Sequence, residues 1–333
     1  MNDKPLHLSL LVYLWLVGLV LLLAGCHSGP DRFDTIRGMN YRLDYNLHEI
    51  AWSPDGRNLA ATGSPRRGGS QVVVIDLETG QAHPVSEVVH DSSHGPEWSP
   101  DGQSLIFFVP SDKVVPLDGG PAEMIPPYNI VIVDAASGEM IRNLGFGSYA
   151  TWTADPDRVI IVGEGKCLEP VQVMEYDLTR NAIRVIGSVP GCITEGADVL
   201  DASNKGVLLI PGEEELQLLD IATGNKVGAL ALPFGLGSSV WSPAGDIIAF
   251  TVDQSRPLEG YLSDHIMLAS ADGSCVSNPL DLELQISSID WNPDGTELVF
   301  ATREAGRIYF MSLTSGVGKE LLDGFRQKCN VYD

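Results

Sequence analysis

The sequence predicts an all-β fold, a six-bladed β-propeller with four antiparallel strands in each blade. Three observations predict it. A Trp-Ser-Pro-Asp-Gly turn recurs along the chain, a second motif recurs in phase with it, and glycine (35) and proline (21) are abundant among the 333 residues. Short strands joined by tight turns need these two residue types, whereas long helices exclude them.

The turn motif is the first of the two repeats. It begins at five tryptophans, which are Trp52, Trp98, Trp152, Trp241 and Trp291. The spacings are 46, 54, 89 and 50 residues, and the spacing of 89 is nearly two periods. One copy has therefore lost its tryptophan, and we expect it at 197–210, with Leu200 in place of the tryptophan and a turn at 204–206.

The second repeat is an apolar strand that ends in a small polar turn. It is found six times, at 72–80, 130–138, 172–181, 216–224, 265–273 and 307–316. The turn motif and the strand motif alternate without exception, so two independent patterns indicate six copies.

One copy supplies the strands of one blade. In the first copy we expect strands at 47–52, 57–62, 72–76 and 82–87, with a β-turn at Ser-Pro-Asp-Gly. A four-stranded sheet with two partly apolar faces is not stable alone, so the six sheets must stack face to face around an axis. We expect the tryptophans to pack between blades. The outermost strand of the sixth blade has two candidates, 317–322 and 40–44.

The repeat resembles that of TolB-type propellers, in which a Trp-Ser-Pro-Asp-Gly turn links the two innermost strands of a blade. The copies at 52–56, 98–102 and 291–295 match best, and the resemblance covers nearly all of 47–323. It implies a scaffold that binds proteins or small ligands and only sometimes catalyses a reaction.

The N-terminus predicts a membrane anchor. Residues 10–24 are an unbroken apolar run, short for a membrane span, and the Leu-Ala-Gly-Cys that ends at Cys26 resembles the lipobox of bacterial lipoproteins. The resemblance implies a signal peptide at 1–25, a lipidated N-terminus and tether at 26–40, and a propeller at 41–333. An uncleaved anchor helix is the alternative. Both place the propeller outside the cytoplasm, in the cell envelope, on the periplasmic or the outer surface.

The net charge of −23 argues against two classes of binding partner. Nucleic acid and anionic lipid surfaces both attract basic proteins, so we expect neither to be bound by this acidic surface.

The long insertions of the repeat all fall opposite the Ser-Pro-Asp-Gly turns. They are 64–70, 110–128 and 253–265. Binding loops on a rigid scaffold cluster in this way, so we expect an envelope protein or a small or polymeric ligand to bind this face.

Two histidines occupy equivalent places at the mouth of the predicted channel, four residues before their tryptophans. The candidate ligand-binding residues there are His48, His94, Ser148, Tyr149, Glu195 and Ser287. Propeller lyases of the oligogalacturonate type, which this chain resembles in its propeller, use channel histidines to hold a metal. A metal needs three or four ligands and only two histidines converge, so we expect polar lining and no metal site.

The cysteines other than Cys26 predict two disulfides in an oxidising compartment, Cys167–Cys192 and Cys275–Cys329. The second would hold the C-terminal tail against the fifth blade. Free buried thiols are the alternative.

The function predicted from these observations is a non-enzymatic, lipid-anchored binding scaffold. No G-x-S-x-G, H-E-x-x-H or Walker motif is found, and Asp55, Asp101 and Asp294 read as turn residues. We therefore expect no catalytic residues, no cofactor and a monomer. The alternative is an anchored lyase or hydrolase that acts at the channel mouth.

Overall fold

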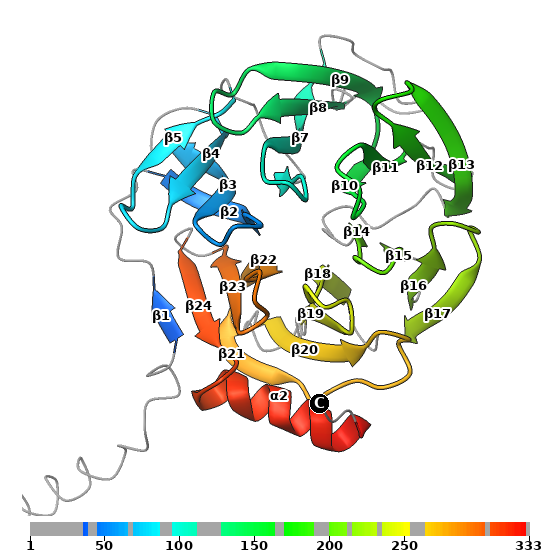
Figure 1. Cartoon of the computed structure of the whole chain (residues 1–333). Coiled ribbons are helices and arrows are strands. Elements are labelled where there is room, and N and C mark those ends of the chain that lie inside the picture. Colours follow the sequence, from blue (N-terminus) through cyan, green and yellow to red (C-terminus); the bar gives the residue numbers. More distant parts are fainter. Residues whose placement is uncertain are drawn as a thin grey trace, which may run out of the picture.

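Six four-stranded sheets surround a central channel in the computed structural model (Figure 1). The structure describes residues 36–38, 45–65, 69–86, 95–111, 128–163, 170–189, 200–211, 215–231, 235–253, 264–303 and 307–330. The predicted fold class is therefore confirmed.

The first five blades use four consecutive strands each, from the channel outward. In blades one to three these are β2 (Tyr45–Trp52), β3 (Asn58–Pro65), β4 (Gln71–Asp76) and β5 (Ala82–Pro84); β6 (Glu97–Trp98), β7 (Ser104–Pro110), β8 (Tyr128–Asp134) and β9 (Met140–Phe146); and β10 (Tyr149–Trp152), β11 (Arg158–Val162), β12 (Val171–Asp177) and β13 (Ala182–Val189). In blades four and five they are β14 (Asp201–Ala202), β15 (Val207–Pro211), β16 (Glu215–Asp220) and β17 (Lys226–Ala231); and β18 (Gly235–Trp241), β19 (Ile247–Asp253), β20 (Asp264–Ser270) and β21 (Leu280–Leu284).

The sixth blade differs because its outermost strand comes from the other end of the chain. Its strands are β22 (Ile286–Trp291), β23 (Glu297–Thr302), β24 (Ile308–Ser312) and β1 (Ile36–Gly38). Ile36 pairs with Met311 and Gly38 with Tyr309 in an antiparallel ladder. Of the two candidates for this position, 317–322 is wrong and 40–44 lies outside the described residues. The strand also falls within 26–40, which we expected to be only a tether.

The blades bury both of their faces against each other. β4, β7 and β20 carry runs of four to six buried residues because each middle strand has a neighbouring blade on either side. Six apolar clusters result, each between two adjacent blades. The tryptophans belong to these clusters, as expected: the Trp52 ring meets the Phe310 ring of blade six edge-on, with centroids 5.4 Å apart.

The Ser-Pro-Asp-Gly segments are β-turns, as the sequence predicts. The Gly56 N–H donates to the Ser53 carbonyl at 2.9 Å, and Gly56 has the positive φ (73°) that favours glycine. The Asp55 carboxylate accepts hydrogen bonds from the Ser53 hydroxyl and the Arg57 N–H. The hydroxyl contributes most to lowering the Asp55 pKa. Asp55 is thus a turn residue, as we expected.

In the fourth copy of the turn motif, the structure corrects which residue takes the place of the tryptophan. The Gly206 N–H donates to the Ser203 carbonyl, so Ser203 corresponds to Ser53 of the first turn. The residue in the tryptophan position is therefore Ala202, and the expectation that Leu200 takes this position is wrong. Leu200 lies two residues earlier on the chain, where blade one has Ile50, and is buried like it.

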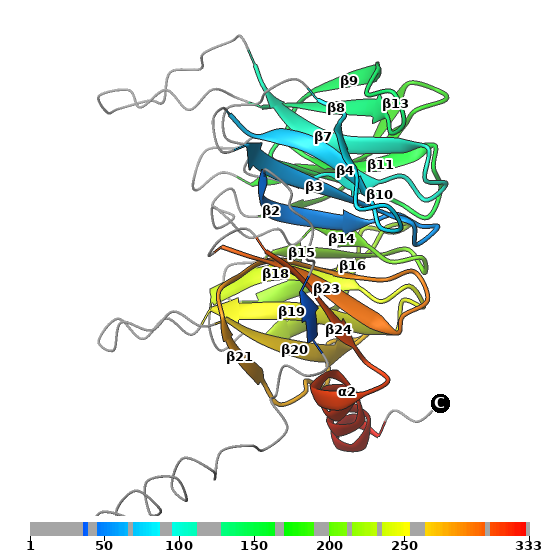
Figure 2. The ribbon, with the colours of Figure 1, turned by 90° about the vertical axis from the view of Figure 1, so that its left-hand side faces the viewer.

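A C-terminal helix, α2 (Gly316–Cys329), covers the outer side of blades five and six (Figures 1 and 2). Val317, Leu321 and Phe325 are spaced four apart, lie on one face of the helix and are buried in the cluster between these blades. This helical spacing is why 317–322 does not form the strand we expected.

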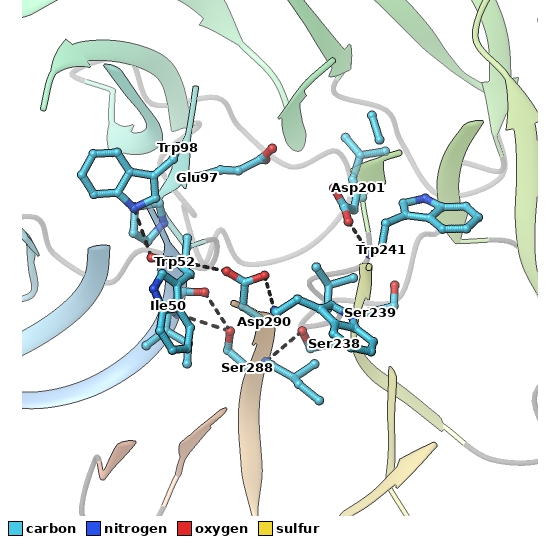
Figure 3. A pocket seen from close by; sticks show the side chains of 18 of the residues that line it. Ile50, Trp52, Glu97, Trp98, Asp201, Ser238, Ser239, Trp241, Ser288 and Asp290 are labelled. Carbon is cyan, nitrogen blue, oxygen red and sulfur yellow. Dashed lines mark hydrogen bonds between the residues drawn. The ribbon is translucent and has the colours of Figure 1, made fainter. Parts of the chain in front are cut away.

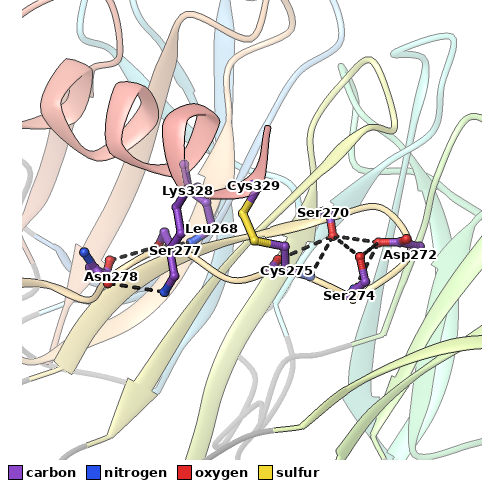
Figure 4. The surroundings of a disulfide bond; sticks show 9 residues. All are labelled: Leu268, Ser270, Asp272, Ser274, Cys275, Ser277, Asn278, Lys328 and Cys329. Carbon is purple, nitrogen blue, oxygen red and sulfur yellow. Dashed lines mark hydrogen bonds between the residues drawn. A yellow bond between two sulfur atoms is a disulfide. The ribbon is translucent and has the colours of Figure 1, made fainter. Parts of the chain in front are cut away.

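A disulfide joins Cys275, which follows β20, to Cys329 at the end of α2 (Figure 4). It is the second of the two pairings that the sequence predicts. The Lys328 amine also donates to Asn278 Oδ1 at 3.3 Å, so two contacts hold this end of the helix. Cys167 and Cys192 lie outside the described residues, and their pairing stays a prediction.

The turns between the third and fourth strands are organised by aspartates. In blade one, Asp76 Oδ1 accepts hydrogen bonds from the Thr79 N–H and hydroxyl, and these lower the Asp76 pKa. Blades two, three and four repeat the arrangement at Asp134, Asp177 and Asp220. In blade five, hydrogen bonds, with that of the Ser270 hydroxyl contributing most, lower the Asp272 pKa to about 2.

We predict that replacing both Cys275 and Cys329 by serine destabilises the protein by about 2–4 kcal/mol, because the disulfide closes a loop with a sequence separation of 54 residues. Urea unfolding of the wild type with and without reductant measures this. The double serine variant is the control and should not respond to reductant. Equal midpoints for the wild type and the variant would contradict the prediction.

We also predict acid lability from the turn aspartates. Their pKa is lower in the folded chain than in the unfolded chain, so they stabilise the fold above a pH of about 4 and this contribution is lost as the pH falls toward 2. Asp272→Asn should therefore reduce the drop in urea midpoint between pH 6 and pH 3. Asp323→Asn on α2, whose carboxylate caps no turn, is the control. An unchanged pH profile for Asp272→Asn would refute this explanation.

Candidate functional site

A cavity of 440 Å³ occupies the channel where the innermost strands approach the Ser-Pro-Asp-Gly turns (Figure 3). Every blade contributes to its wall. The prolines of four turns reach it, which are Pro54, Pro100, Pro243 and Pro293. The cavity therefore extends toward the turn side of the propeller.

The innermost strands have main-chain N–H groups around this cavity that need hydrogen-bond acceptors. Each has a neighbour in its own blade on one edge only, so main-chain N–H groups on the other edge need acceptors. Side chains of the preceding blade supply them. Asp290 Oδ2 accepts from the Trp52 N–H at 2.5 Å, and Asp290 Oδ1 accepts from the Trp291 N–H at 2.7 Å. One carboxylate thus joins blades six and one.

The same contact is found in alternate blades. The residue before the tryptophan, or before its equivalent, is Glu97 in blade two, Asp201 in blade four and Asp290 in blade six. Glu97 Oε1 accepts from the Trp152 N–H at 3.0 Å and the Thr151 hydroxyl at 2.7 Å, and Asp201 Oδ2 accepts from the Trp241 N–H at 2.7 Å. Three carboxylates therefore point along the channel wall, each bonded to the next blade.

Serines complete the connections between blades five, six and one. The Ser288 hydroxyl accepts from the Ile50 N–H at 3.3 Å, and Ser238 Oγ accepts from the Ile289 N–H at 3.4 Å. Between blades one and two, Trp98 Nε1 donates to the Ala51 carbonyl at 3.1 Å. These contacts hold the innermost strands in register around the cavity.

The charge of the cavity wall is negative. Its lining residues include Glu97, Asp201 and Asp290 but no lysine, arginine or histidine within the described segments. Tryptophans and prolines form the apolar part of the wall. Such a wall favours a ligand that carries a positive charge or hydrogen-bond donors on an apolar frame.

The residues predicted for the channel mouth are partly brought to this site. Tyr149 lines the cavity and is buried. His48 lies where the register of β2 and β3 shifts between Leu47 and Ile50, and its carbonyl accepts the Ser287 hydroxyl at 2.6 Å. The Ser148 hydroxyl donates to Gly163 of its own blade. None of His48, Ser148 and Ser287 lines the cavity.

The remaining predicted residues cannot be placed. His94 and Glu195 lie outside the described residues, so the convergence of His48 with His94 stays a prediction. Within the described segments, no group of three or more His, Cys, Asp or Glu side chains is arranged to hold a metal ion. Likewise, none of the helices formed by these segments has the length and apolar character to cross a membrane.

The three channel carboxylates were missed by the sequence reasoning. The sequence pattern that could have revealed them is an acidic residue directly before the tryptophan position in alternate copies. The residue pairs are Glu-Trp, Asp-Ala and Asp-Trp. In the fourth copy the misplaced tryptophan position hid it.

We predict that Asp290→Ala destabilises the fold by about 1–2 kcal/mol, because the Trp52 and Trp291 N–H groups lose their acceptor. Asp290→Asn keeps one acceptor oxygen and should cost less. Urea unfolding measures both, with Asp323→Ala as the control. Equal costs for the alanine and asparagine variants would contradict this role of the carboxylate.

Comparison with curated proteins gives short matches only, and no family model matches the chain. The uncharacterized peptidase YuxL of Bacillus subtilis is 36% identical over 58 residues, and dipeptidyl-peptidase 5 of Porphyromonas gingivalis is 29% identical over 68 residues. These matches cover 17% and 18% of this chain, and 9% and 10% of the two relatives. The chain thus spans about a tenth of the length of these relatives.

Solved structures match over most of the chain. Hydrazine synthase of Kuenenia stuttgartiensis superposes with a TM-score of 0.57 at 18% identity, covering 87% of this chain and 86% of that one. A putative TolB of Agrobacterium tumefaciens gives 0.53 at 14% identity, covering 80% and 90%, and TolB of Acinetobacter baumannii gives 0.50 at 17% identity, covering 81% and 55%. At these identities the likeness concerns the fold: the chain is a six-bladed propeller whose structural neighbours include TolB proteins and WD40-type propellers.

Proposed function

We propose that this chain is a non-enzymatic binding scaffold of the cell envelope that holds a protein or smaller ligand at its central channel. The observation that carries the proposal is the 440 Å³ cavity with carboxylates from alternate blades in its wall. Because each carboxylate is bonded to the next blade, the wall is rigid before a ligand arrives, and a rigid site loses little conformational entropy on binding. A lysine or arginine side chain of a partner matches the negative charge of this wall.

The insertions of the repeat offer a second contact region, at the end of the channel away from the turn prolines that line the cavity. Pro110 pairs with Tyr128 and Asp253 with Asp264, so the insertions of blades two and five leave the sheets at the end opposite the turns. We propose that these insertions contact a partner at that end, and that the cavity receives a projecting side chain from the turn side. The resemblance to TolB-type propellers supports a protein partner, since the fold is shared with TolB.

We propose an extracytoplasmic location. Residues 1–25 are removed, Cys26 is lipidated, and a tether that ends before β1 joins the lipid anchor to the propeller. The propeller is a monomer. The Cys275–Cys329 disulfide supports an oxidising compartment, because such bonds persist outside the cytoplasm. Two or more acyl chains would hold the protein on a membrane without a spanning helix.

The anchor is tested by the Cys26→Ala variant expressed in a bacterial host. We expect the wild type to incorporate labelled palmitate and to sediment with membranes, and the variant to do neither. Incorporation of label by the variant would refute lipidation at Cys26.

Binding is tested with residues 31–333 used to capture proteins from an envelope extract, comparing the wild type with Asp201→Asn. We expect a partner that is retained by the wild type, lost at high salt, and at least about tenfold weaker on Asp201→Asn. Asp323→Asn on α2 is the matched control. A partner held equally by Asp201→Asn would place the site elsewhere.

The enzymatic alternative has its own test. Metal analysis of 31–333 should find no stoichiometric metal. A stoichiometric metal that is lost in the His48→Ala/His94→Ala variant would favour a channel-mouth lyase or hydrolase over the scaffold.

A further inference from the structure

The rim of blades two to four, formed by β9, β13 and β17, carries an apolar surface that the channel function does not use. All the large hydrophobic side chains that are exposed in the described part of the chain lie on these three strands. They are Ile183 (61% exposed), Met140 (58%), Ile141 (56%), Val185 (54%), Val227 (54%) and Phe146 (39%). Exposed apolar side chains gathered on adjacent elements mark an interaction surface.

The rest of the rim is protected. Helix α2 lies over blades five and six, and the outermost strands of blades one and six, β5 and β1, have only three residues each (Figure 1). Short or covered edge strands are how proteins avoid unwanted strand pairing. In contrast, β9, β13 and β17 have seven, eight and six residues.

The three strands of this rim lack the acidic excess of the whole chain. Asp and Glu outnumber Lys and Arg by 44 to 21, yet β9, β13 and β17 contain no acidic residue. They contain three cations, which are Arg142, Arg184 and Lys226. Two of these cations form ion pairs, Arg184 with Glu175 and Lys226 with Glu215, so the rim is apolar and its excess of positive charge is small.

Arg184 is held in place at the centre of this rim. Its guanidinium donates to Glu175 of the same blade and to the Ile221 and Ala222 carbonyls of blade four, while 47% of the side chain stays exposed. Ile183 and Val185 flank it on β13. Because strand side chains alternate between faces, the two apolar residues share one face and Arg184 lies on the other.

We propose that the rim is a second binding surface, occupied by an extended segment of a partner protein that pairs with β13 and alternates apolar and acidic side chains. β13 pairs with β12 on one side and is the outermost strand of its sheet. An added strand with this pattern sets its apolar side chains beside Ile183 and Val185 and its acidic side chains beside Arg184, and such cross-strand pairs stabilise a sheet.

A second copy of this chain fits the rim less well. A symmetric pairing of two β13 strands brings like surfaces together, so cations meet cations. A lipid surface also fits less well, because the net charge of −23 repels anionic headgroups. The acidic segment is therefore the occupant that the observations favour.

The experiment uses the full chain in detergent and a synthetic peptide of about nine alternating valines and glutamates, about the length of a strand. We expect the peptide to bind and to slow amide exchange at 182–189. Ile183→Glu/Val185→Glu should weaken binding at least about tenfold, and Arg184→Gln should also weaken it. The control variant is Gln81→Glu/His83→Glu, which adds the same charges to the exposed rim of blade one and should bind normally.

Three outcomes would overturn the proposal. The first is the absence of binding, or equal binding of a peptide with lysine in place of glutamate. The second is a dimer in sedimentation that the Ile183→Glu/Val185→Glu variant abolishes, which would assign the rim to a second copy. The third is protection of 182–189 by vesicles of phosphatidylcholine and phosphatidylglycerol without peptide, which would assign it to lipid. Urea unfolding of each variant confirms that its fold is intact.

Discussion

Closure of the ring gives every blade a neighbour on both sides of its sheet. A blade buries both faces only when it has a neighbour on either side, and the six apolar clusters lie between blades rather than within them. The cluster between blades six and one joins Leu47 and Val73 to Val299 and Phe310, residues from opposite ends of the propeller sequence. β1 then completes blade six by pairing across the same junction.

Closure also sets the chemistry of the channel. Around the axis the innermost strands of adjacent blades come close together, and their N–H groups must find acceptors that the sheets do not provide. Carboxylates at Glu97, Asp201 and Asp290 provide them in alternate blades, so the groups that stabilise the ring also give the cavity its negative wall. Stability and ligand preference are thus properties of the same side chains.

The rim differs from the channel because each outermost strand has one edge that no other blade covers. The chain protects this edge on three blades with short strands or with α2, whose position the Cys275–Cys329 disulfide secures. It leaves the edge long and apolar on the other three. The channel wall carries three carboxylates, whereas the outermost strands of these three blades carry exposed apolar side chains and no acidic residue, so one scaffold presents two chemically distinct surfaces.

The number of blades, the order of their strands and the turns could be predicted from the sequence, because these are local patterns that repeat. The Ser53–Gly56 turn and the strands of blade one needed only the residues within one copy, and the places of the cysteines on the predicted blades indicated Cys275–Cys329. In contrast, the assembled structure was needed to show that β1 closes blade six, that 317–322 is helical, and that Ala202 rather than Leu200 stands in the tryptophan position. Only it brought Asp290 to the Trp52 N–H, 238 residues away in the sequence. The β1–β24 pairing and the Asp290–Trp52 contact form between residues far apart in the chain, and no repeat within the sequence records which of them meet when the ring closes. The helix and the Ser203–Gly206 turn are local, and there the interpretation of the sequence was wrong.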